Sequence, residues 1–464
     1  MPSLPFQCLI LPAVALASSG CAVLLDSRTS SPPVGASLRA HVEFLASDAL
    51  NGRGSGTRDE RIAAEYVGNH FRRLGFAPAD SSGTFVHTID LEQSTLIGMP
   101  RLVGAGVRWT HGDEILVPSM NVPAISGPLQ HLAGAGAVQD VRRGAMVFVS
   151  APISPDEASR LFAAGASTIL TPASPQARER WAVAANTAPR LETRLIAFPS
   201  SPEPRARITL AEASAAALSR LPEGTVLRLE TDLGPPARSQ TWNAVGILHG
   251  TRPDIGAVLV SAHLDHLGRR SPDAGAADVI FNGADDNASG TAAVMALAEQ
   301  VARHGRPKRT VVFAAFGSEE AGATGSRYFV AHPVVPLTSI VANLQIEMLG
   351  RPDALVPAQT LWLTGYDRSD LGPELARRGA KIVADPRPSQ NFFERSDNYT
   401  LARRGVVAHT VSSFGLHKEY HTAADEAALI DWKHMETAVG SLVKPLMWLA
   451  NSDFVPAWRP GGRP

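Results

Sequence analysis

The second half of the chain alternates short apolar runs with segments of helical periodicity, and this pattern restricts the fold more than any other feature. From Thr241 onward the apolar runs cover residues 257–260, 310–316, 340–346 and 406–411. Predominantly apolar runs of this length are typical of strands buried on both faces, and the helical segments between them supply the crossovers that parallel strands need. The sequence therefore predicts an α/β fold with a mixed, mainly parallel sheet flanked by helices.

Histidine and acidic residues follow these apolar runs. They are His263 and Asp265, Glu319 and Glu320, Glu347, and His421. One further acid, Asp286, comes just before a helical segment that starts near Ser289, where Asn287 or Ser289 is suited to cap the helix. Because ligands of such sheets collect outside the carboxyl ends of the strands, we expect these side chains to meet at one edge. Imidazole and carboxylate groups suit a pair of zinc ions, although cobalt or manganese ions accept similar ligands.

The chain resembles the zinc aminopeptidase family often called M28 in six motifs, which occur in the order HLDH, GADDNASG, SEEAGATGS, IEMLG, RSDNY and YHTAAD. The resemblance covers roughly residues 36–95 and 240–450 and implies a zinc-exopeptidase-like fold with a co-catalytic metal pair. It implies that one zinc is bound by His263, Asp286 and Glu347. The other zinc is then bound by Asp286, Glu320 and His421, so that Asp286 bridges the pair. Glu347 stands where the family commonly has Asp, and the longer side chain displaces its carboxylate by one methylene.

Two further residues complete the predicted active site. Zinc lowers the pKa of a bound water to about 7, which makes hydroxide available at neutral pH. Glu319 and Glu320 are neighbours whose side chains diverge in an extended backbone, which leaves Glu319 free to act as the general base. Asp265 is expected to accept a hydrogen bond from the far ring nitrogen of His263 and so to fix the orientation of the ring. The SD element at residues 396–397 matches the family and is expected to support the pocket or to cap a loop.

Some positions allow a second interpretation. Asp285 is the alternative ligand if Asp286 caps the helix instead, and His417 competes with His421. His266 is expected to support the site rather than to bind metal. Four further histidines of this half are expected to be surface or packing residues: His304, His332, His409 and His434.

The character of the chain changes between residues 96 and 233. Short candidate strands such as AMVFVS and STILTP alternate there with Gly- and Pro-rich turns and a helical piece near residues 157–165. The segment VRRGAMVFVS followed by LFAAGASTILTP resembles a protease-associated (PA) domain, a β-rich insertion common in the M28 family. We therefore predict an N-terminal peptidase segment at residues 36–95, an inserted β-rich PA-like domain at residues 96–233 and a catalytic segment at residues 240–452.

The first twenty residues are apolar and end in small residues, which is typical of an export signal at residues 1–20. The following residue, Cys21, stands where bacterial lipoproteins carry the lipidated cysteine, so membrane attachment through Cys21 is expected; the alternative is a cleaved signal that releases a soluble protein. The other cysteine, Cys8, lies inside the signal, so the mature chain forms no internal disulfide. The predicted location is periplasmic, anchored to the outer membrane, or secreted.

The motifs favour an enzyme that acts on peptides. A formal net charge of −1 gives no reason to expect nucleic acid as a partner. The sequence predicts a metallo-aminopeptidase, which removes N-terminal residues from peptides with a free amino terminus and uses two zinc ions as cofactors. Two alternatives stay open: a carboxypeptidase or glutaminyl-cyclase-like enzyme on the same fold, and a binding protein with an inactive peptidase fold. The complete ligand set and Glu319 favour the enzyme.

Overall fold

The computed structural model describes residues 34–79, 82–93, 97–179, 181–185, 190–191, 194–195, 204–232, 234–235, 237–270 and 277–464. The predicted export signal and Cys21 lie outside these residues. No helix within the described ranges has both the length and the apolar character needed to cross a bilayer.

In the described chain, ten strands form one mixed sheet whose centre is parallel. The central strands are, in order across the sheet, β17 (Thr310–Phe316), β14 (Ala257–His263), β18 (Ile340–Ile346) and β21 (Val407–Ser412). Beyond β17 lie the antiparallel strands β13 (Ala237–Leu248), β2 (Val86–Gln93) and β10 (Arg194–Leu195), and β1 (Ala77–Pro78) also pairs with β13. Beyond β21 lie β19 (Leu361–Leu363), which is antiparallel to β21, and β20 (Ile382–Ala384), which is parallel to β19. The sheet is therefore mixed as predicted, with the parallel pairing concentrated in its centre.

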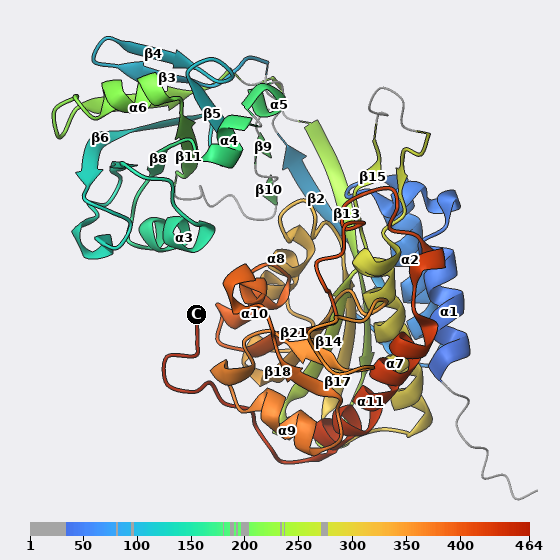
Figure 1. Cartoon of the computed structure of the whole chain (residues 1–464). Helices are drawn as coiled ribbons and strands as arrows, with labels where there is room; N and C mark the ends of the chain where they lie inside the picture. The colour runs from blue at the N-terminus through green and yellow to red at the C-terminus, as the bar shows by residue number, and fades with distance from the viewer. Residues whose placement is uncertain are drawn as a thin grey trace, which may run out of the picture. The chain divides into compact units, whose positions relative to one another are not determined.

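Helices cover both faces of this sheet. Every residue of β14 is buried, and alternate side chains point to opposite faces. Val258 and Val260 belong to a core that includes residues of α1 (Val34–Leu45), α2 (Arg58–Arg73), α7 (Gly290–Arg303) and α11 (Trp432–Asn451). Leu259 belongs instead to a core with α8 (Thr324–Ala331) and α10 (Asn398–Ala402). Figure 1 shows α1, α2 and α7 on one side of the sheet and α8 and α10 on the other, which confirms the predicted α/β architecture.

Local sequence explains where the principal helices begin. At the start of α2, the side chain of Thr57 accepts a hydrogen bond from the backbone N–H of Glu60 at 3.3 Å. At the start of α7, Asn287 Oδ1 accepts the N–H of Gly290 at 3.0 Å, so Asn287 rather than Ser289 supplies the side-chain acceptor. These acceptors satisfy N–H groups that have no partner within the first helical turn.

A second sheet lies in the region between Arg101 and Glu230. In the described chain it has nine strands, ordered β4 (Val107–Thr110), β3 (Arg101–Gly104), β12 (Val226–Glu230), β6 (Ala124–Leu132), β7 (Met146–Val149), β8 (Thr168–Pro172), β11 (Ala206–Leu210), β5 (Ile115–Met120) and β9 (Arg190–Leu191). The same region contains α3 (Pro155–Ala163), α4 (Pro175–Glu179), α5 (Trp181–Ala185) and α6 (Glu212–Leu218). The region is β-rich as predicted, although β10 pairs with the first sheet. Its assignment as a PA-like domain stays a prediction.

Two small elements complete the description near the candidate site. The strands β15 (Gly268–Arg269) and β16 (Ile280–Phe281) form an antiparallel pair. The helix α9 (Leu371–Arg377) contributes Leu371 and Leu375 to the core of α1 and α7.

Candidate metal centre

The five predicted metal ligands lie at the carboxyl edge of the central strands. His263 is the last residue of β14, and Glu347 directly follows β18. Glu320 and His421 lie in the loops after β17 and β21, and Asp286 lies in the turn before α7. Parallel strands end at the same edge of a sheet, so segments that are far apart in sequence bring their side chains to one place.

The first group of candidate ligands surrounds His263. Its Nε2 lies 3.3 Å from Asp286 Oδ1 and 3.8 Å from Glu347 Oε1. Its Nδ1 lies 3.2 Å from the backbone oxygen of Asp265 and 3.7 Å from Oδ1 of the same residue. The ring is therefore oriented by Asp265 at one nitrogen, mainly through the backbone carbonyl, and presents the other nitrogen to two carboxylates.

The second group shares Asp286 with the first. His421 Nε2 lies 3.1 Å from Asp286 Oδ2 and 3.1 Å from Glu320 Oε1. His266 also joins this group, because its Nδ1 lies 2.9 Å from Glu320 Oε1 and 3.8 Å from Asp286 Oδ2. Asp286 thus turns one carboxylate oxygen to each group, which is the arrangement that a bridging ligand requires.

Both groups suit a divalent metal ion. Within each group the candidate ligand atoms lie within 4.8 Å of one another. Nε2 of His263 and Oε2 of Glu347 are buried and form no hydrogen bond within the described chain. Buried polar atoms without partners cost folding free energy. A metal ion bound by nitrogen and oxygen ligands would satisfy these atoms.

The pKa values of these side chains also indicate a site that is suited to a metal ion. Burial raises the pKa of Asp286, but the nearby rings of His263, at 3.3 Å, and His421, at 3.1 Å, outweigh burial and hold that pKa well below its usual range. Burial lowers the pKa of His421, yet its hydrogen bonds with Asp286 and Glu320 raise that pKa to about 9. Burial also raises the pKa of Glu347 to about 7. The carboxylates therefore favour protonation of the histidine nitrogens. A proton and a metal ion bind the same nitrogen lone pairs, so they compete for these atoms.

The predicted base, Glu319, lies beside these groups. Burial raises the pKa of its carboxyl group well above the usual range, and the negative charges of Glu347 and Glu320 act in the same direction against the opposing effect of His263. Its backbone N–H donates to Asp265 Oδ1 at 2.9 Å, and that of Glu320 donates to Asp265 Oδ2 at 3.3 Å. The carboxylate of Asp265, predicted to accept a hydrogen bond from His263, therefore mainly accepts backbone N–H groups of the Glu319 loop instead.

The two alternative ligands, Asp285 and His417, pair with each other. Asp285 Oδ2 pairs with His417 Nε2 at 3.0 Å, and Asp285 Oδ1 accepts the N–H of Gly350 at 2.7 Å. The pair lies outside both candidate ligand groups. Their contacts assign Asp285 and His417 to holding the loops around the site.

Asp397, in the SD element at residues 396–397, is fully buried, and burial raises its pKa to about 6.

Sequence reasoning missed two residues that shape the site. The carboxylate of Asp425 accepts the backbone N–H groups of Asp285 and Asp286, the latter at 3.0 Å. The buried guanidinium of Arg53 donates to the backbone oxygens of Asn282 at 2.8 Å and Gly283 at 3.0 Å. Asp425 lies within the YHTAAD motif, which could have signalled it, whereas nothing in the sequence around Arg53 marks its partners.

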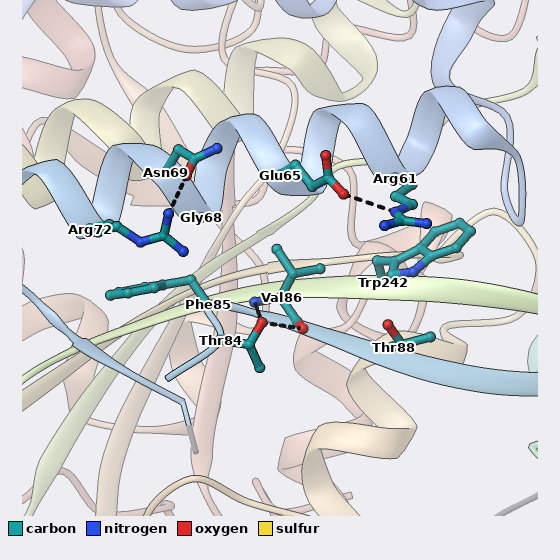
Figure 2. Close-up of a pocket in the computed structure, with 10 residues that line it drawn as sticks. All are labelled: Arg61, Glu65, Gly68, Asn69, Arg72, Thr84, Phe85, Val86, Thr88 and Trp242. Carbon is teal, nitrogen blue, oxygen red and sulfur yellow. Dashed lines mark hydrogen bonds and ion pairs between the residues drawn. The ribbon is translucent and has the colours of Figure 1, made fainter. Parts of the chain in front are cut away.

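Two of the cavities in the described structure bear on the location of the site. One borders Glu347 and is lined largely by aromatic and small polar side chains, among them Trp362, Phe392, Phe414 and Tyr420. The other, of about 350 Å³, lies between α2 and the strands β2 and β13, as Figure 2 shows. Its lining, which includes Arg61, Glu65 and Arg72, contains no member of either ligand group. The larger cavity is therefore separate from the candidate ligand groups.

A mixed α/β sheet flanked by helices, with two histidine and carboxylate groups at its carboxyl edge, defines the class of zinc-exopeptidase-like folds. Residues 243–444 match the family model described as peptidase family M28. Leucine aminopeptidase 1 of Trichophyton equinum is 36% identical over 204 residues, which are 41% of this chain and 53% of that protein. Leucine aminopeptidase 1 of Trichophyton rubrum is 24% identical over the same length. The chain thus spans about half the length of the curated relatives it matches.

Several solved structures are similar over about nine tenths of the chain. Among them, the aminopeptidase from Aneurinibacillus sp. strain AM-1 has a TM-score of 0.53 and 17% sequence identity, and the match covers 92% of this chain and 96% of that one. At this level of identity the likeness shows the fold alone.

Proposed function

We propose that this protein is a metal-dependent aminopeptidase whose candidate metal centre binds two zinc ions. The observation that carries the proposal is the shared aspartate: Asp286 presents Oδ1 to His263 at 3.3 Å and Oδ2 to His421 at 3.1 Å. A carboxylate between two ligand groups is suited to join two ions about 3.5 to 4 Å apart. The M28 match of residues 243–444 supports the assignment to peptide hydrolysis.

In this proposal His263 and Glu347 would complete the ligands of one zinc ion, and Glu320 and His421 those of the other. His266, at 2.9 Å from Glu320, would orient that carboxylate or take a place beside it. When bound, the ions would supply Lewis acidity toward the scissile carbonyl and hydroxide at neutral pH.

Glu319 would move the proton. A carboxylate accepts the proton of the attacking water as the new C–O bond forms at the scissile carbonyl. It then donates that proton to the amine nitrogen as the C–N bond breaks. Burial raises the pKa of Glu319, which brings the carboxyl group closer to the range in which a general base both accepts and returns a proton at neutral pH.

The cavity beside Glu347 would receive the side chain of the N-terminal residue. Trp362, Phe392 and Phe414 contribute aromatic surface to it. Apolar surface favours an apolar partner by roughly 25 cal/mol per Å² buried. We therefore expect leucine or phenylalanine substrates to be hydrolysed with higher kcat/KM than aspartate or lysine substrates.

The test is hydrolysis by the purified chain of amino-acid anilides, combined with measurement of zinc per chain. The proposal expects release of aniline from leucine anilide, none from the N-acetylated compound, and loss of activity on chelation that zinc restores. Glu319→Gln is expected to keep its metal while kcat falls by roughly 10²–10⁴-fold. Glu65→Gln, at the exposed Arg61 pair on α2, is the matched control.

Each outcome of this assay separates the alternatives. Activity that requires a free carboxyl terminus would identify a carboxypeptidase, and one zinc per chain with cyclisation of N-terminal glutamine would identify a cyclase. Metal binding without any hydrolysis would contradict the enzymatic proposal. Unchanged activity of Glu319→Gln would remove Glu319 from the mechanism.

A further inference from the structure

Three buried ionisable side chains meet between α1, α2 and α7, and they belong to neither ligand group described above. They are His41 on α1, His70 on α2 and Glu299 on α7. Glu299 Oε1 lies 3.6 Å from His70 Nε2 and 4.0 Å from His41 Nε2. The side chains are 8%, 3% and 11% exposed for His41, His70 and Glu299, so all three are removed from bulk water.

The nitrogen of His41 that faces Glu299 has no hydrogen-bond partner in the described structure. Its Nε2 is buried and unpaired, while its Nδ1 lies 2.7 Å from the hydroxyl of Tyr66. If Nδ1–H donates to Tyr66, Nε2 carries a free lone pair directed toward the carboxylate. Metal-binding histidines are commonly held in this way, with the second ring nitrogen donating to an oxygen.

The two imidazole rings are placed to act together. Their centroids are 4.9 Å apart and their planes are nearly perpendicular, at 87°. Burial lowers the pKa of His41 to about 3 and also lowers that of His70, so both rings are neutral at physiological pH. Neutral imidazoles are the form that binds metal. In a tetrahedral zinc site with bonds of about 2.0 to 2.1 Å, neighbouring ligand atoms lie roughly 3.3 Å apart. The observed separations of 3.6 Å and 4.0 Å from Glu299 Oε1 therefore need to close by less than about 1 Å.

Two arginines surround the same carboxylate. Arg73 Nη2 lies 3.8 Å from Glu299 Oε1, and Arg303 Nη2 lies 3.6 Å from Oε2. Arg73 also contacts His70 Nδ1 at 3.1 Å, while His70 Nε2 lies 3.2 Å from the backbone oxygen of Met295. The side chain of Arg73 is 70% exposed and loses little by returning to water. When it leaves, the proton of His70 can move to Nδ1, which frees Nε2 for a ligand.

We propose that His41, His70 and Glu299 form a second metal site, which takes one zinc ion or a similar divalent ion and fixes α7 to α1 and α2. The ligand atoms are Nε2 of both histidines and Oε1 of Glu299, and water completes the coordination. The turn that carries Asp286 leads directly into α7, and Glu299 lies near the other end of that helix. The site is structural and independent of the proposed peptidase activity.

The experiment measures zinc binding in a background without the candidate active centre. The double variant Asp286→Asn with Glu320→Gln, in the full chain, removes ligands from both groups described above. Competition with a chromophoric chelator, using zinc chloride, is expected to show one remaining high-affinity zinc per chain. Adding His41→Gln or Glu299→Gln should weaken this binding by about 100-fold or more. His434 is a buried histidine that is hydrogen-bonded to Ser413. Adding His434→Gln to the background variant should leave zinc binding unchanged.

A second variant separates a metal site from a simple ion-pair network. Arg73→Ala removes a cation that competes for Glu299 and His70, so zinc binding in the background variant should tighten by about tenfold. Near-ultraviolet circular dichroism establishes that each variant is folded. The proposal is overturned if the folded background variant binds no zinc tightly, or if His41→Gln and Glu299→Gln bind it as well as their parent. Failure of anilide hydrolysis by the wild-type chain would instead affect only the proposed function.

Discussion

The two sheets of this molecule differ in whether they bury ionisable side chains. At the carboxyl edge of the ten-stranded sheet, His263, Asp265 and Asp286 are almost completely buried. In the region of the nine-stranded sheet, no Asp, Glu, Lys or Arg of the described residues is buried, and the core is built from side chains such as Leu102 and Leu227. Removing a charge from water costs several kcal/mol unless it is paired. The ten-stranded sheet buries several carboxylates and imidazoles together at its carboxyl edge, and this marks the place where chemistry is expected.

The difference also predicts which property a mutation in each region should change. In the nine-stranded sheet the core is mainly apolar, so a substitution there should change stability without changing the proposed reaction. At the edge of the ten-stranded sheet, a substitution should change metal binding or turnover even when the fold is kept.

The largest effect is expected for Asp286→Asn. An amide binds zinc more weakly than a carboxylate and carries no charge to offset two ions. We expect loss of at least one zinc per chain and a fall in kcat/KM of about 10³-fold or more for leucine anilide. The control is Glu223→Gln, which removes an exposed carboxylate that pairs with Arg142 in the other region. Full metal content in Asp286→Asn would show that Asp286 does not bridge.

Leu227→Ala tests the prediction for the nine-stranded sheet. Leu227 is fully buried on β12, and truncation of a buried leucine lowers the free energy of unfolding by about 2–5 kcal/mol. We expect this loss in urea unfolding, with kcat/KM for a small anilide unchanged. The neighbouring residue Val226 is 64% exposed, so Val226→Ala should change stability by less than about 0.5 kcal/mol. A large loss of kcat/KM in folded Leu227→Ala would mean that the two regions are not functionally separate.

The strands were predictable because burial on both faces leaves a direct record in sequence. Residues 310–316 and 340–346 are predominantly apolar, and β17 and β18 occupy these residues. The run at residues 406–411 was predicted one residue early, because β21 starts at Val407 and continues to Ser412. Strand ends are less certain, since the last residue of a strand faces the site and need not be apolar.

The convergence of the candidate ligands was also predictable, because parallel strands end at one edge. Their assignment as zinc ligands stays a prediction. The contribution of Arg53 was not predictable, because it depends on backbone carbonyls at Leu264, Asn282 and Gly283, more than 200 positions away in sequence. His266 was given a supporting role, and its distance of 2.9 Å to Glu320 depends on a loop geometry that no local pattern encodes.

A buried histidine makes the ten-stranded sheet sensitive to acid. His409 on β21 is fully buried and contacts Thr364 and Ser369, and burial lowers its pKa from 6.5 to about 4. Because the folded-state pKa is below the unfolded one, the stability that it contributes is complete above about pH 6.5. This stability is lost as pH falls toward 4, by at most about 3 kcal/mol at ~1.4 kcal/mol per pH unit.

Urea unfolding at pH 7.5 and pH 4.5 measures this contribution. His409→Gln is expected to be less stable than the wild type at pH 7.5 but to lose less stability on acidification. His304→Gln, at an exposed position at the end of α7, should keep the pH dependence of the wild type. An unchanged pH dependence in His409→Gln would mean that other groups cause the acid sensitivity.

The smallest effect is expected for Glu60→Gln, which tests how the Glu319 loop is held. Glu60 is fully buried on α2, where its Oε1 accepts the N–H of Ser318 at 2.8 Å and its Oε2 accepts that of Gly56 at 2.7 Å. A glutamine keeps the shape but must turn its NH₂ group toward one of these donors, so the backbone next to Glu319 should shift. We expect kcat to fall by roughly tenfold with KM and zinc content little changed, as for other groups that orient a catalytic residue. Glu65→Gln on the exposed face of the same helix is the control, and an equal kcat in both variants would show that the loop holds its position without Glu60.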